Sequence, residues 1–274
     1  MADLYDRVFG IDFSGAKDAG DRIWISRCSV TNEGLRVERC IPARDLPESG
    51  KKRDRCLEAL RTLIAGAGRA IFGLDFPFGL PRALINYQSW ESFVLAFPNE
   101  YQSPETFRQA CRESTPGREL KRKADRVAKA PFAPYNIRLY RQTYYGIQRL
   151  LAPLVETGQA RVLPMQEPAQ GKPLLLEVCP ASTLKEEGLY LPYKGSSERR
   201  RRGRQRILHG LEQKAVNIQS RELRSTFIED VGGDALDSVV AAVATFRAQQ
   251  DHAFPRSEAR DNDDAYAAEG YVYV

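Results

Sequence analysis

The chain has 274 residues, of which 42% are hydrophobic, so it is long and apolar enough for one large domain with a buried core and is not a disordered protein. Its formal charge of +5 is too small to indicate a nucleic-acid partner by itself. Five scattered cysteines without a C-x-x-C pair argue against a disulfide framework and a zinc site, and two histidines exclude a His-rich metal centre.

The first six residues are acidic and lack the apolar core of a signal peptide. No apolar run approaches the roughly 18 residues that span a bilayer. We therefore expect a soluble, cytoplasmic protein without a membrane partner.

The first third of the chain predicts the beginning of a mixed sheet. Residues 7–13, 22–30 and 35–41 are rich in Val, Ile, Phe and Trp and are separated by short Gly- and Asn-containing breaks, which favours an antiparallel meander. An amphipathic helix over residues 53–65 then leads into a strand over residues 69–75. Since a helix between strands usually crosses over to a parallel neighbour, we expect this fourth strand to join the same sheet.

The remainder alternates between helical and extended patterns. Residues 80–171 are punctuated by prolines and show no strong strand, so we predict a mainly helical insertion, followed by a strand over residues 174–178. Small apolar side chains over residues 234–248 predict a helix that packs closely against the sheet. We expect an acidic, loose tail over residues 251–269 and an edge strand over residues 271–274.

The predicted fold class is therefore α/β, with residues 1–274 forming a single domain. Its mixed sheet would consist of an antiparallel three-strand meander plus parallel strands, flanked by helices.

Acidic side chains recur where the predicted strands end and where the last long helix begins. Asp12, Asp75 and Glu177 each close an apolar run, while Asp234 and Asp237 follow a Gly-Gly pair with helical spacing. Carboxylates at the rim of a sheet repel one another, and Mg²⁺ or Mn²⁺ relieves that repulsion through oxygen ligands. Two such ions about 4 Å apart can activate water for phosphodiester hydrolysis. We predict that all five acids bind metal and that the four aspartates are catalytic.

Each acid also has an ordinary structural role that the sequence leaves open. Asp12 and Asp75 could open turns, and Glu177 could pair with an arginine. Asp234 is a natural N-cap after two glycines, and Asp237 would favour the helix dipole. A shared two-metal site is impossible if the carboxylates lie more than roughly 10 Å apart.

Two basic stretches are candidates for binding nucleic acid. One lies in the predicted insertion, where tyrosines interleave with arginines, and the other is an arginine run before the last long helix. Both patterns also fit solvated helix faces. The candidate residues are Arg138, Arg141, Arg199, Arg200, Arg201 and Arg202.

Five short stretches resemble the domain of unknown function 429 family, which belongs to the ribonuclease H-like superfamily and is proposed to contain nucleases. They are GIDFSGA (10–16), GLDFPFGLP (73–81), EVCP (177–180), GDALDS (233–238) and EGYVYV (269–274). The resemblance implies a ribonuclease H-like sheet in which Asp12, Asp75 and the Asp234/Asp237 pair bind two Mg²⁺ or Mn²⁺ ions. The family's fold also carries a glutamate on its first helix, but Glu58 here matches no motif, which leaves Glu177 as the candidate substitute.

The leading hypothesis is a metal-dependent nuclease that hydrolyses phosphodiester bonds in DNA or RNA by a two-metal carboxylate mechanism. One alternative is an ATP-dependent phosphotransferase of the related kinase fold, for which residues 12–15 are a loose version of the phosphate-binding turn. Another is a nucleic-acid-binding protein without catalytic activity.

Overall fold

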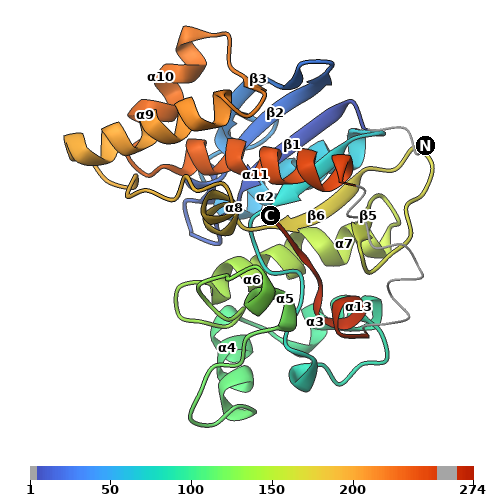
Figure 1. Ribbon diagram of the computed structural model, residues 1–274. Coiled ribbons are helices and arrows are strands. Elements are labelled where there is room, and N and C mark those ends of the chain that lie inside the picture. The colour runs from blue at the N-terminus through green and yellow to red at the C-terminus, as the bar shows by residue number, and fades with distance from the viewer. Residues whose placement is uncertain (1–4, 252–263) are drawn as a thin grey trace.

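A mixed sheet runs through the computed structural model, which describes residues 5–251 and 264–274, and helices cover both of its faces (Figure 1). The strand order is β5-β6-β4-β1-β2-β3-β7, and β8 also pairs with β6. The bounds of the strands are β1 (Arg7–Asp12), β2 (Trp24–Thr31), β3 (Gly34–Pro42), β4 (Ile71–Leu74), β5 (Arg161–Leu163), β6 (Leu174–Val178), β7 (Val216–Asn217) and β8 (Val272–Tyr273).

The first three strands form the predicted antiparallel meander. The β1–β2 and β2–β3 pairs are antiparallel, whereas β4 pairs with β1, and β6 with β4, in parallel. The turn between β2 and β3 needs a residue with positive φ, and Gly34 supplies it with φ of 119°. The predictions of an α/β class and a mixed sheet are therefore confirmed.

One face of the sheet is covered by α2 (Arg53–Gly66) and by helices of the predicted insertion. Phe9 and Phe72 stack on this face with ring centroids 4.4 Å apart, and both are buried. The α2 side chains Leu57 and Leu60 belong to the same core cluster. This helix follows β3 in the chain and leads into β4, and its apolar face lies in the core cluster that contains the β1 and β4 side chains.

The opposite face is covered by α11 (Asp234–Gln250), the helix of small apolar residues. A Cβ atom at Gly10 in β1 would overlap the backbone of Ser238 and Ala242 in α11. Glycine thus permits a closer approach of helix and strand than any other residue. The prediction that this helix packs tightly on the sheet is confirmed.

The predicted insertion is mainly helical, but it also contains a strand. Its elements pack into the same core cluster as the β1 and β4 side chains, beneath the sheet as drawn in Figure 1. Residues 80–171 were predicted to show no strong strand, and the strand that the structure places there, β5, has only three residues and pairs with β6. The helices are α3 (Trp90–Glu100), α4 (Pro104–Glu113), α5 (Lys123–Val127), α6 (Tyr140–Gly146), a π-helical turn (Ile147–Leu151) and α7 (Ala152–Glu156), with a short 3₁₀ turn at Arg82–Leu84.

Four further helices lie within residues 5–251: α1 (Ala19–Arg22), α8 (Pro180–Glu186), α9 (Glu198–Glu212) and α10 (Arg221–Glu229). A 3₁₀ turn at Ala43–Asp45 follows β3. In Figure 1, α9 and α10 form a layer beside the start of α11. No helix in the described ranges is both long and apolar enough to cross a bilayer.

The C-terminal segment returns to the sheet. Part of the predicted loose tail, residues 252–263, lies outside the described residues, but α13 (Asp264–Glu269) is helical, so the prediction is wrong there. The final residues form β8 and pair in parallel with β6, Val272 opposite Glu177. This confirms the predicted terminal strand.

Candidate active site

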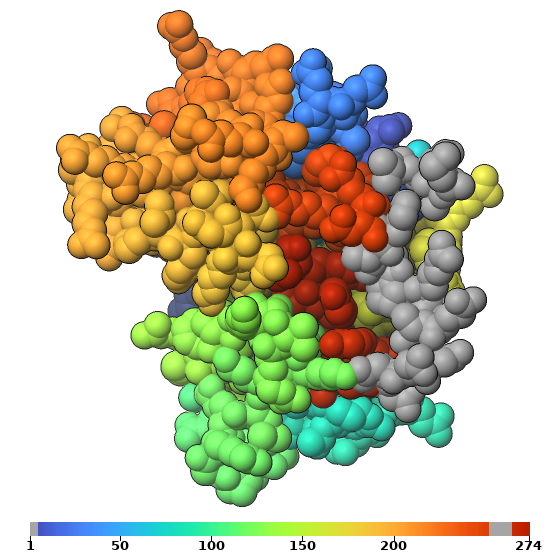
Figure 2. All heavy atoms as spheres, viewed as in Figure 1, coloured from blue at the N-terminus to red at the C-terminus, as the bar shows by residue number. Residues whose placement is uncertain are grey.

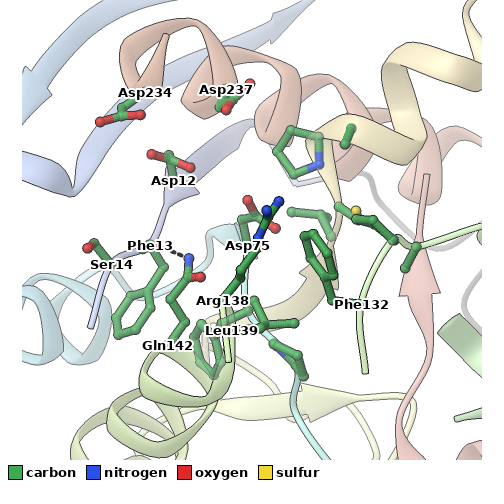
Figure 3. Close-up of a pocket in the computed structure, with 18 of the residues that line it drawn as sticks. Asp12, Phe13, Ser14, Asp75, Phe132, Arg138, Leu139, Gln142, Asp234 and Asp237 are labelled. Carbon is green, nitrogen blue, oxygen red and sulfur yellow. Dashed lines mark hydrogen bonds between the residues drawn. The ribbon is translucent and has the colours of Figure 1, made fainter. Parts of the chain in front are cut away.

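Four aspartates meet at the edge of the sheet where β1 and β4 end. Asp12 is the last residue of β1, and Asp75 follows β4 directly, with its backbone N–H donating to the carbonyl of Ile11 at 3.0 Å. Asp234 and Asp237 come from the first turn of α11, which crosses above this edge. All four line one pocket, and Figure 3 shows their carboxyl groups around it.

The start of α11 leaves its two aspartates available to the pocket. The helix is capped by Asp230, whose Oδ2 accepts the backbone N–H of Ala235 at 2.9 Å. Gly233 precedes the helix in a left-handed conformation, with φ of 75°. The N-cap position considered for Asp234 is therefore occupied by Gly233, and Asp230 satisfies one backbone N–H of the first turn.

Burial and mutual repulsion change the acidity of the strand-end carboxyl groups. Asp12 is 8% exposed, and burial raises its pKa well above the ordinary value, with the charge of Asp237 adding to the effect. Burial, with Asp237 again contributing, raises the pKa of Asp75 to about 8. Neither Asp12 nor Asp75 makes a side-chain hydrogen bond or ion pair with another residue that the structure describes. No side chain pairs directly with these two acids, although the charge of Lys194 opposes the rise in their pKa.

Asp237 is the exception, because both of its oxygens have partners. The Tyr193 hydroxyl donates to Oδ1 at 2.6 Å, and the Lys194 Nζ lies 2.6 Å from Oδ2 and 3.6 Å from Asp234 Oδ1. Burial raises the pKa of Asp237, and these two partners oppose that shift. The sequence did not identify either partner of Asp237, since Lys194 stands in no recognisable motif.

A buried arginine holds the loop that carries Tyr193 and Lys194. Arg204 on α9 is 2% exposed, and its Nη1 donates to the carbonyls of Tyr193 at 2.6 Å and Gly195 at 2.9 Å. Its Nε donates to the carbonyl of Ile228 at 2.6 Å. The carbonyl groups on both sides of Lys194 are thus fixed by one side chain.

The arginine run separates into different environments along α9. Arg200 lines the pocket, whereas Arg199 is exposed on the helix and does not line it. Arg201 pairs with Glu229 at 3.1 Å and Arg202 with Glu198 at 3.2 Å, both near the surface. Of residues 199–202, the structure brings only Arg200 to the acids.

Arg138 and Arg141, from the insertion, both line the pocket. Figure 3 shows Arg138 reaching into it, while Arg141 pairs with Glu105 at 2.9 Å. The neighbouring Gln142 donates a hydrogen bond to the carbonyl of Phe13, directly after Asp12. This contact docks the insertion against the loop that follows β1.

Glu177 lies beside the site but has a different environment. Arg122 contacts both of its oxygens, with Nη1 2.8 Å from Oε2, and the backbone N–H of Phe78 donates to the same oxygen at 2.8 Å. Arg122 also pairs with Asp125. The structure thus gives Glu177 an arginine partner, the alternative role that the sequence left open.

The pocket is a cleft of about 1440 Å³ between the sheet edge, residues 130–142 and the loop at residues 190–194. In Figure 2 the surface is hollowed between the yellow-orange segment near residues 180–200 and the green segment near residues 120–140. The cleft exceeds the roughly 300–1,000 Å³ of typical small-molecule sites, so it has room for part of a polymer.

Carboxylate oxygens dominate the floor of the cleft, and such hard donors suit Mg²⁺ or Mn²⁺. No group of three or more His, Cys, Asp or Glu side chains that could hold a metal ion is found within residues 5–251 and 264–274. The ammonium group of Lys194 lies between Asp234 and Asp237.

The chain matches no protein-family model, no curated protein and no solved structure.

Proposed function

We propose that the protein is a metal-dependent nuclease that hydrolyses phosphodiester bonds in DNA or RNA. The observation that carries the proposal is the meeting of Asp12, Asp75, Asp234 and Asp237 from three separate elements in one cleft. Stability alone gives no reason to place several unpaired carboxyl groups together, since burying a charge without a partner is costly. Such clusters with shifted pKa values are typical of functional sites.

The chemistry of these residues fits a divalent cation of the Mg²⁺ or Mn²⁺ kind. Asp12 and Asp75 have side-chain oxygens without a hydrogen-bond partner among the described residues, and Asp234 is reached only by Lys194 at 3.6 Å. A cation held here would polarise the phosphate and lower the pKa of an attacking water.

The chain's own residues then bind and orient the substrate. Arg138 from the insertion and Arg200 from α9 both line the cleft and would contact phosphates along the strand. Tyr193 fixes the orientation of Asp237. In hydrolysis, the water oxygen forms a bond to phosphorus, the bond from phosphorus to one sugar oxygen breaks, and the released proton passes to that oxygen.

The topology supports the same proposal. The order β3-β2-β1-β4-β6, with a late helix that begins over the end of β1, agrees with the arrangement that the resemblance to ribonuclease H-like proteins implies. We therefore propose that the chain has a ribonuclease H-like fold, with Asp12 at the centre of its site.

The test is cleavage of labelled single-stranded, duplex, hybrid and branched oligonucleotides with Mg²⁺ or Mn²⁺. We expect metal-dependent cleavage by the wild type and none by Asp12→Asn, which keeps the shape of the side chain. Asp54→Asn is the matched control, because Asp54 is exposed and lies outside the cleft.

Equal cleavage by the wild type and Asp12→Asn would refute the carboxylate mechanism. ATP turnover without cleavage would favour the phosphotransferase. Oligonucleotide binding that survives the loss of Asp12, without cleavage, would favour a binding protein.

A further inference from the structure

Lys194 places an ammonium group among the carboxylates of the cleft. Its Nζ contacts Asp237 Oδ2 at 2.6 Å and lies 3.6 Å from Asp234 Oδ1. Its charge also acts on Asp12 and Asp75, which have no ion-pair partner of their own among the described residues. Lys194 therefore interacts electrostatically with all four aspartates.

The fold holds the backbone of Lys194 in this position. Arg204 fixes the carbonyls of the residues before and after it, and the backbone N–H of Gly195 donates to the carbonyl of Val231 at 2.7 Å. The lysine side chain itself remains 51% exposed. A group with a fixed base and an accessible tip is well suited to contact a ligand that enters the cleft.

Asp237 differs from the other three aspartates, because both of its carboxylate oxygens are occupied by other side chains. The Tyr193 hydroxyl and the Lys194 ammonium occupy its two oxygens, one each. Asp237 is 3% exposed, so little room remains for another ligand on it. The open oxygens of the site belong to Asp12, Asp75 and Asp234.

We propose that the cleft takes one divalent cation, beside the open oxygens of Asp12 and Asp75, and that Lys194 supplies the second positive charge at the reacting phosphate. This inference rests on the proposed function and changes the two-ion arrangement predicted from the sequence. A pair of ions about 4 Å apart needs carboxylate ligands for both. Asp237 is already engaged, and the ammonium beside it repels a second cation.

An ammonium group can perform this role because it is a compact charge with three hydrogen-bond donors. Lys194 would donate to a non-bridging phosphate oxygen and so offset the negative charge that develops there in the transition state. Tyr193 would keep its hydrogen bond to Asp237, which orients the lysine.

The test is to count the Mn²⁺ ions bound to the metal-free full chain, by calorimetry together with electron paramagnetic resonance of the free ion. We expect one ion per wild-type chain. Lys194→Met should bind two, because it frees Asp237 and removes the competing charge, whereas Lys194→Arg should still bind one. Lys51→Met is the control, because Lys51 also pairs with an aspartate, Asp21 at 3.6 Å, but lies outside the cleft.

Two ions on the wild type, or equal counts for the wild type and Lys194→Met, would overturn the inference and leave the metal-dependent nuclease standing. Absence of Mn²⁺ binding to the wild type would remove both the proposed function and this inference. The wild-type count involves no substitution, so it decides the matter even where Lys194→Met does not fold.

Discussion

Asp75→Asn should stabilise the protein, and increasingly so as the pH rises. The pKa of Asp75 is raised from its ordinary value of 3.8 to about 8, chiefly by burial. Between these values the folded protein keeps a proton that the unfolded chain has lost, so the stability of the wild type falls as pH rises through this window and levels off above about 8. Asparagine has no proton to lose, and its variant lacks this dependence.

The rise in the pKa of Asp75 from 3.8 to about 8 limits how much the substitution can stabilise the protein. At about 1.36 kcal/mol per pKa unit, the gain in the free energy of unfolding has an upper bound of roughly 5–6 kcal/mol. Because protonation of Asp12 or Asp237 relieves part of the same repulsion, we expect a gain of about 2–3 kcal/mol at pH 9 and near zero at pH 4.

The assay is urea unfolding followed by circular dichroism at pH 4, 6.5 and 9, with EDTA present to remove metal ions. The control Asp54→Asn should follow the wild type at every pH, because Asp54 is exposed. Parallel curves for the wild type and Asp75→Asn, or a less stable variant at pH 9, would refute the view that burial beside other carboxylates disfavours the charged form of Asp75.

Three other substitutions test the fold and the cleft. Gly10→Ala should destabilise the protein by at least about 1–3 kcal/mol in thermal or urea unfolding, since its Cβ would overlap α11; stability equal to the wild type would contradict the close packing. Glu177→Gln should cost about 3–5 kcal/mol in the same assay by removing one of the two carboxylate partners of the buried Arg122, while the number of Mn²⁺ ions bound should not change. Arg138→Ala and Arg200→Ala should each weaken oligonucleotide binding and lower the slope of log affinity against log salt by about 1; an unchanged slope in a titration from 50 to 200 mM salt would show that the side chain does not contact phosphate.

The parts of the fold that the sequence predicted are those encoded by local patterns. Runs of β-branched and aromatic residues marked β1 to β4, and small side chains marked the helix that packs on Gly10. β5 escaped prediction because it has three residues, Arg161–Leu163, in a proline-rich stretch, and it becomes a strand by pairing with β6. α13 escaped prediction because it has only six residues and follows an acidic stretch of the sequence.

The sequence identified the acidic residues that line the cleft, but it did not identify the basic residues that pair with them. Asp12 and Asp75 could be recognised because each ends an apolar run. The partners that decide the roles of the other acids are remote in the chain: Arg122 lies 55 residues from Glu177, and Lys194 contacts the start of α11 from a separate loop. No periodicity or spacing in a single sequence identifies such pairs, since only the folded chain brings them together.

Asp75→Asn is expected to raise the free energy of unfolding, whereas Glu177→Gln is expected to lower it. This difference supports the argument about function. Both acids stand at the same edge of the sheet, since Leu74, just before Asp75, is opposite Glu177 in the β4–β6 pair. The fold supplies Glu177 with a buried arginine and leaves Asp75 without one. A neighbouring strand end therefore shows that this protein can neutralise a carboxylate in this setting. Asp12 and Asp75 therefore lack a direct partner in a setting where the fold could have provided one. A bound cation would supply the positive charge that neutralises them.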